Sequence, residues 1–124
     1  MTPMENLEIR RSTGAGSNTT ILRLAGPLTL ATLFDFQTAV RQPELKNVIL
    51  DLSGVPYIDS GGLGVILSAW AHGQRSQSKF ALAGVCERVK TLLDMTKVDS
   101  MLPQFATVED AERNFGDNAA AAPR

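Results

Sequence analysis

A strongly apolar stretch in the middle of the chain, followed by a helical pattern, most constrains the fold. Residues 48–52, Val-Ile-Leu-Asp-Leu, have the composition of a buried strand. From Ser60 to about Gln77 the apolar residues recur at helical spacing, and a second short apolar run follows at 79–84. A strand, a helix and another strand in this order predict parallel strands joined by a right-handed crossover, with the helix packed on the sheet. The residues expected to face the core from this helix are Leu63, Ile66, Leu67, Trp70 and Ala71.

The N-terminal part of the chain predicts a hairpin and a helix. Strand-like alternation over 4–11 and 19–25 flanks a flexible turn at 14–18, which indicates a β-hairpin. Residues 29–41 predict a helix that Thr29 caps. Its expected apolar stripe consists of Leu30, Leu33, Phe34 and Val40.

The C-terminal part continues the alternation of helices and strands. We expect a helix over 87–96, a last strand over 98–105 and a final helix over 107–115 that begins at the cap Thr107. The whole pattern predicts an α/β fold: a mixed β-sheet of about four to five strands with about four α-helices packed on it. Residues 1–115 should form a single domain, and residues 116–124 a disordered tail.

Size and charge limit the classes of function. With 124 residues, of which 44% are apolar, the chain can bury one core without a metal or a disulfide. Twelve basic and thirteen acidic residues give a net charge of −1, so no basic surface for direct nucleic-acid binding is expected. Cys86 has no partner for an internal disulfide, and no leader or long apolar segment is visible. These features predict a cytoplasmic protein that does not insert into membranes.

The motif Tyr57-Ile58-Asp59-Ser60-Gly61-Gly62-Leu63-Gly64 is the strongest candidate for a functional site. It places Ser60 where the buried strand gives way to the helix, and a serine there is a good helix cap. Glycines in the first helical turn leave the backbone open to close approach. The simplest interpretation is that Ser60 caps the helix and that the glycines allow tight packing. Each glycine costs roughly 1 kcal/mol relative to alanine, however, which favours a requirement for close contact with something.

The residues do not support an enzyme. A hydrolase nucleophile elbow requires glycine two positions before the serine, where this chain has Ile58. The sole histidine, His72, lies about 18 Å along the same predicted helix from Ser60, too far to act as its base. One histidine and one cysteine cannot form a common metal site, so we expect no metal and no cofactor. Weak nucleotide binding at the free N–H groups of the glycine-rich helix start remains open.

Four sequence stretches are shared with a known family. The most specific are Val-Ile-Leu-Asp-Leu-Ser at 48–53 and Ile-Asp-Ser-Gly-Gly-Leu-Gly at 58–64. Leu-Ala-Gly at 24–26 and Thr-Val-Glu-Asp-Ala at 107–111 support them. From residue 21 to residue 115 the chain resembles a STAS domain, the fold of bacterial anti-sigma factor antagonists.

The resemblance implies a switch protein that regulates transcription. In such antagonists the serine matching Ser60 is phosphorylated by a partner that is both anti-sigma factor and serine kinase, and a serine phosphatase is a further expected partner. The implied partner-binding residues are Asp59, Ser60, Gly61 and Gly62. The unmodified protein would occupy the anti-sigma factor and release a sigma factor, and phosphorylation at Ser60 would end that binding.

Two features keep other functions in view. Many antagonists carry an aspartate soon after the glycine of the first loop, where Gly26-Pro27-Leu28 is followed here by Thr29. Gly-Pro-Leu in that loop also resembles STAS domains that work with transporters. The alternatives are therefore a subunit that regulates a membrane transporter through its cytoplasmic ATPase or permease, and a scaffold or nucleotide-sensing module that is not phosphorylated.

Overall fold

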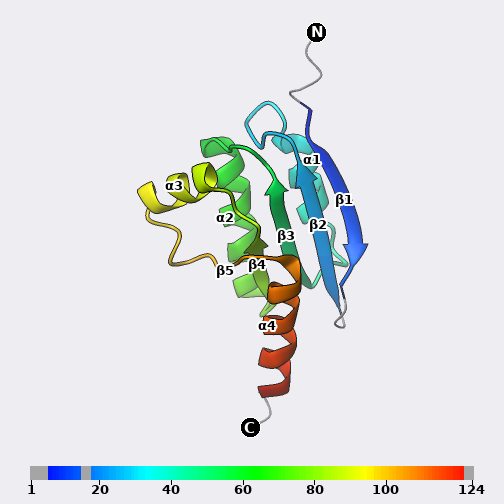
Figure 1. Ribbon diagram of the computed structural model, residues 1–124. Coiled ribbons are helices and arrows are strands. Elements are labelled where there is room, and N and C mark those ends of the chain that lie inside the picture. The colour runs from blue at the N-terminus through cyan, green and yellow to red at the C-terminus, as the bar shows by residue number, and fades with distance from the viewer. Residues whose placement is uncertain (1–5, 15–17, 122–124) are drawn as a thin grey trace.

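The computed structural model describes residues 6–14 and 18–121, and side chains up to residue 115 (Figure 1). Within these residues it contains one sheet of five strands and four helices. The strands are β1 (Glu8–Thr13), β2 (Thr19–Ala25), β3 (Asn47–Gly54), β4 (Phe80–Ala83) and β5 (Gln104–Phe105). The helices are α1 (Leu33–Val40), α2 (Ser60–Arg75), α3 (Glu87–Met95) and α4 (Val108–Ala121).

The sheet is mixed, as the sequence predicts. The strand order is β1-β2-β3-β4-β5, with β1 antiparallel to β2 and the other neighbours parallel. The hairpin is confirmed, although residues 4–5 of its predicted first strand and residues 15–17 of its turn lie outside the described residues. Because β2 to β5 advance across the sheet in sequence order, each connection contributes a crossover helix.

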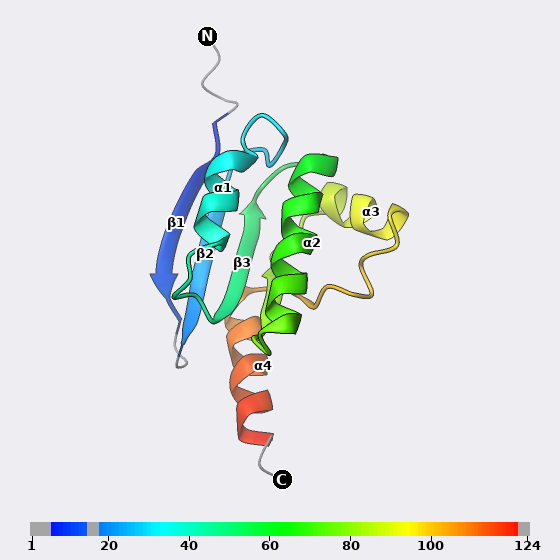
Figure 2. The same cartoon turned by 180° about the vertical axis from the view of Figure 1, so that it is seen from behind.

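The core has two layers, one on each face of the sheet. Strand β3 shows the alternation that separates them, since Leu50 faces one cluster and Ile49 the other. The larger cluster takes buried residues from α1, α2 and α3, and the smaller one takes them from α4. Figure 2 shows α1 and α2 side by side on their face of the sheet, and Figure 1 shows α4 on the opposite side.

Helix α1 differs most from the sequence prediction. It begins at Leu33, because residues 27–32 form a turn in which the Thr32 hydroxyl donates to the carbonyl of Pro27 (2.8 Å) and accepts from the N–H of Thr29 (3.0 Å). The predicted cap at Thr29 is therefore wrong. The predicted stripe is also partly wrong: Leu30 and Phe34 are 74% and 73% exposed, whereas the unpredicted Phe36 is fully buried.

Two further boundaries differ from the prediction. Strand β5 spans only two residues, because 98–102 form turns before Pro103, which cannot donate to a strand ladder. Helix α4 continues to Ala121, so residues 116–121, predicted as part of a disordered tail, are helical. A single Gly116 costs a helix only about 1 kcal/mol, and the alanines that follow are strong helix formers. Residues 122–124 lie outside the described part of the chain.

No helix in the described part of the chain is long and apolar enough to span a membrane.

Candidate functional site

Ser60 is the first residue of α2 and its side chain is exposed. The segment before it is fixed to the turn that precedes α1 by a parallel bridge between Leu28 and Ile58. The N–H of Leu28 donates to the carbonyl of Tyr57 (3.1 Å), and the N–H of Asp59 donates to the carbonyl of Leu28 (3.2 Å). The Ser60 hydroxyl is therefore presented to solvent by two loops that hold each other in place.

Asp59, and not Ser60, caps α2. One oxygen of its carboxylate accepts from the N–H of Gly62 (3.0 Å). The other oxygen accepts from the N–H of Leu30, also at 3.0 Å. Asp59 thus satisfies an orphan donor of the helix and ties it to the turn before α1.

The hydrogen bonds of Asp59 also set its charge state. Burial alone would raise the pKa of this carboxyl, but the N–H donors of Leu30, Gly62 and Gly61 outweigh that effect and lower the pKa. Asp59 is therefore a carboxylate at neutral pH. The sequence predicts an anion site at the free N–H groups of this glycine-rich helix start, but the Asp59 carboxylate already accepts from the N–H of Gly62. This argues against the nucleotide-sensing alternative.

The glycines of the first turn serve different purposes. A Cβ atom on Gly62 would lie 2.4 Å from the carbonyl oxygen of Leu28, and one on Gly61 would lie 3.0 Å from the side chain of Leu33. The close approach at these two positions is therefore made by the protein itself, and Gly62 is buried. The prediction of an open backbone is wrong there. Gly64 differs, because it is exposed and a Cβ on it would meet no atom of the described residues within 4 Å.

A groove of about 620 Å³ runs between α1 and α2. Its α1 wall consists of Leu33, Gln37 and Val40, with Arg41 just beyond the helix. Residues spaced by three or four along α2 line the other side, namely Ser60, Gly64, Ser68, His72 and Arg75. His72 shares this groove with Ser60 but lies twelve residues away along the helix, as the sequence predicts.

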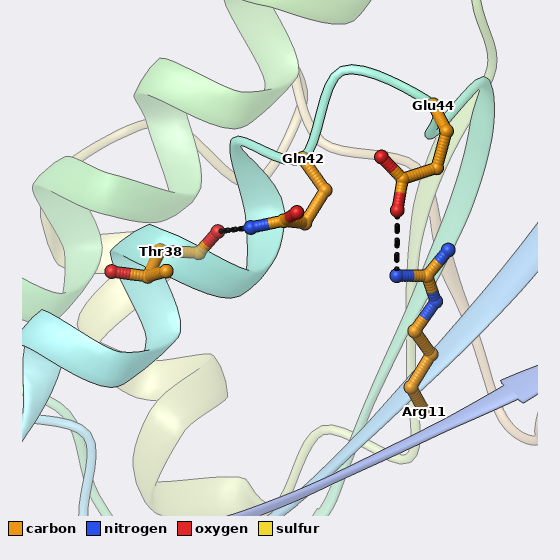
Figure 3. A network of polar contacts seen from close by, with 4 residues as sticks. All are labelled: Arg11, Thr38, Gln42 and Glu44. Carbon is orange, nitrogen blue, oxygen red and sulfur yellow. Dashed lines mark hydrogen bonds and ion pairs between the residues drawn. The ribbon is translucent and has the colours of Figure 1, made fainter.

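Arg41, which begins the loop after α1, lines the groove at the end away from Ser60, and a surface ion pair connects this loop to β1 (Figure 3). Arg11 on β1 forms an ion pair with Glu44 at 3.0 Å, and both side chains are about half exposed. The side-chain amide of Gln42 donates to the carbonyl of Thr38 at 2.9 Å, in the last turn of α1. A hydrogen bond from its own backbone and the Arg11 guanidinium lower the pKa of Glu44.

The side chains in the described part of the chain include no group of three or more His, Cys, Asp or Glu that could hold a metal ion.

Comparison with known proteins identifies the family. The model of the STAS domain matches residues 6–111. The chain belongs to the STAS domain family. A relative of this STAS domain is the anti-sigma F factor antagonist of Paenibacillus polymyxa, 28% identical over 89 residues that cover 68% of this chain and 76% of the relative.

Solved structures share the fold. An anti-sigma-factor antagonist (STAS) domain protein from Planctomyces limnophilus superposes with a TM-score of 0.74 at 22% identity, covering 87% of this chain and 97% of that one. The Bacillus cell fate determinant SpoIIAA in its phosphorylated form gives 0.67 at 17% identity, covering 87% and 99%. A sulfate transporter family protein from Wolinella succinogenes gives 0.69 at 19% identity, covering 82% and 88%. The five-stranded mixed sheet with four helices seen in the described residues is thus the STAS fold.

The structure places Ser60 at the exposed start of a helix, as the sequence predicts, but the sequence does not indicate what surrounds it. The structure adds the hydrogen bond between Asp59 and Leu30 and the groove along α2, and whether Asp59, Ser60, Gly61 and Gly62 bind a partner stays a prediction. The repeat of Gly64, Ser68 and His72 at intervals of four was a signal for one wall. The opposite wall came from a helix whose buried face the sequence pattern assigned incorrectly.

Proposed function

We propose that this STAS domain is an anti-sigma factor antagonist, a binding protein without catalytic activity. It binds an anti-sigma factor that is also a serine kinase, and so releases a sigma factor. The observation that carries the proposal is the exposed Ser60 hydroxyl at the start of α2, held beside the Asp59 carboxylate. The relative from Paenibacillus polymyxa, an anti-sigma F factor antagonist, supports it.

The kinase partner would end the interaction by phosphorylating Ser60. The Ser60 oxygen attacks the γ-phosphorus of ATP, a new O–P bond forms, and the bond between the γ-phosphorus and the β–γ bridging oxygen breaks to release ADP. The hydroxyl proton passes to a base of the kinase. Asp59 is a poor base, because its oxygens accept backbone N–H bonds and its pKa is lowered. Its role is to position the turn that presents Ser60.

Phosphate on Ser60 would disrupt the docked complex by charge. It adds about −1.5 to −2 charges beside the ionised Asp59. The N–H groups of Gly62 and Leu63 already donate to Asp59, so they are not available to neutralise the phosphate. Repulsion and desolvation worth about 3 kcal/mol would lower affinity about a hundredfold. Because the Ser60 side chain points to solvent, the fold itself need not change, and hydrolysis by a serine phosphatase would restore binding.

The test is phosphorylation by the partner. The protein is incubated with MgATP and each purified serine-kinase anti-sigma factor of the source genome, and the modified residue is mapped by mass spectrometry. We expect one phosphate at Ser60 and none on Ser60→Ala. Ser76→Ala removes another exposed hydroxyl, at the far end of the same helix, and should be phosphorylated like the wild type. Phosphate at another residue, or none with any such kinase, would overturn the proposal.

A second candidate is a subunit that regulates a transporter. Thr29 occupies the position of the family's aspartate, and its side-chain oxygen accepts from the N–H of Ala31 at 3.2 Å, within the turn. That arrangement leaves no acidic group at this position for a kinase to recognise. The fold shared with the protein from Wolinella succinogenes supports this candidate. Stable co-purification with the cytoplasmic ATPase or permease of a transporter, without phosphate on Ser60, would favour it.

A further inference from the structure

We propose that the groove between α1 and α2 is the second half of the partner interface, and that it binds an acidic, amphipathic segment of the anti-sigma factor. The inference rests on the proposed function. It extends the interface from the Ser60 turn along the full length of α2, which spans about 22 Å between Ser60 and Arg75 at the usual rise of a helix.

Gly64 indicates that something approaches this groove closely. Gly61 and Gly62 are explained by contacts within the protein, but Gly64 has open space where its side chain would be. Alanine would fit there and would favour the helix by about 0.5–1 kcal/mol. The missing side chain instead leaves this position of the α2 wall open, in a groove that Leu33 and Val65 also line.

Charge defines what the groove accepts. The end away from Ser60 carries Arg41, Arg75 and His72, and among the described side chains no Asp or Glu lines the groove. Both arginines are exposed, and within the described residues neither belongs to an ion pair. Lys46 lines an adjoining hollow that shares His72 with the groove. Acidic side chains of a partner complement this end.

Two exposed apolar residues lie near the groove: Leu30 beside the Ser60 turn, and Phe34 on α1, one turn before the groove residue Gln37. Leu30 and Phe34 are 74% and 73% exposed, and Leu30 is tied to Asp59 by a hydrogen bond. Large exposed apolar side chains next to a groove are typical anchors of a protein interface. A partner segment would therefore place its apolar residues near Ser60 and its acidic ones near Arg41 and Arg75. A phosphate on Ser60 would place charge against the apolar part of that segment.

The charge test compares variants of equal net charge. Stopped-flow association with the anti-sigma factor that phosphorylates Ser60 is measured for Arg41→Gln/Arg75→Gln and for the control Arg10→Gln/Lys90→Gln, whose sites lie on other elements. We expect the groove variant to associate about tenfold more slowly, with a weaker dependence on salt. The control should match the wild type. Equal rates and salt slopes for the groove variant and the control would overturn the inference.

The shape test fills the groove. Gly64→Leu adds a side chain at a helix position where a Cβ would contact no other described residue. Leucine also favours the helix more than glycine does, so the variant should fold at least as stably as the wild type. We expect it to bind the same anti-sigma factor at least tenfold more weakly, whereas Gln74→Leu, on the same helix outside the groove, should bind normally. Normal binding by Gly64→Leu would overturn the inference.

The outcomes separate the two proposals. If Ser60→Asp weakens binding while the groove variants do not, the groove is not part of the interface and the switch stands. If no serine-kinase anti-sigma factor binds the wild type, both proposals are overturned.

Discussion

Removing the Asp59 carboxylate should destabilise the protein by a calculable amount. Asp59→Ala loses the cap on Gly62, worth about 1 kcal/mol, and the bond to the N–H of Leu30, worth about 1.5 kcal/mol at a partly exposed site. The sum is about 2.5 kcal/mol, which for a domain of this size lowers Tm by about 10 °C. Asp59→Asn keeps an oxygen for the cap and loses only the second bond, so about 1.5 kcal/mol is expected.

The same carboxylate predicts a pH dependence of defined sign. The folded pKa of Asp59 lies below the ordinary value of 3.8, so its contribution is fully present above that value. It is lost as the pH falls from 3.8 through the folded pKa. Wild type should therefore lose more stability than Asp59→Asn over this range.

Urea denaturation followed by the fluorescence of the single tryptophan, Trp70, measures both effects. The series runs from pH 7 to pH 2 for the wild type, Asp59→Asn and Asp59→Ala. A stability of Asp59→Ala within about 0.5 kcal/mol of the wild type at pH 7 would refute the bonding assigned to this residue. Parallel stability curves for the wild type and Asp59→Asn below pH 4 would refute the assigned pKa.

Other substitutions test the packing of the site. Gly62→Ala should lower the free energy of unfolding in urea by about 2 kcal/mol, because its Cβ would lie 2.4 Å from a backbone oxygen. Gly64→Ala should raise it by about 0.5–1 kcal/mol. A Gly62→Ala variant more stable than Gly64→Ala would contradict this account. Phe36→Ala should cost about 3–5 kcal/mol and Phe34→Ala less than about 0.5 kcal/mol, and equal losses would show that the buried face of α1 is misassigned. Arg11→Gln should leave Tm unchanged in calorimetry, since its ion pair is exposed, and a large decrease would show that the pair holds the loop after α1.

The sheet and most of its helices were predictable because apolar periodicity reports burial directly. Residues 48–52 have almost no polar positions and form the central strand, and Ile66 lies fully buried at the predicted face of α2. The exposed position of Ser60 followed from the change of pattern at that point.

The cap of α2 could not be chosen from sequence. Asp59 and Ser60 are adjacent and both are favourable caps, so local preference does not distinguish them. The N–H of Leu30, 29 residues earlier in the chain, contributes to that choice by binding the second carboxylate oxygen of Asp59. Such a contact exists only after the two loops are brought together.

The buried face of α1 was misjudged for a similar reason. Leu30 and Phe34 fit a helical stripe by spacing, but the turn held by Thr32 delays the helix to Leu33, and Phe36 then faces the core. An eight-residue helix gives too few turns for periodicity to fix its orientation. The groove could not be predicted from the sequence, because its walls come from α1 and α2 and depend on how the two helices pack together.

The affinity of the purified serine-kinase anti-sigma factor for the protein, with and without phosphate on Ser60, tests the central claim most directly. Titration calorimetry on the two forms, each verified by mass spectrometry, gives the ratio of their Kd values. The account predicts that the phosphorylated form binds about a hundredfold more weakly. Kd values that agree within experimental error would contradict it.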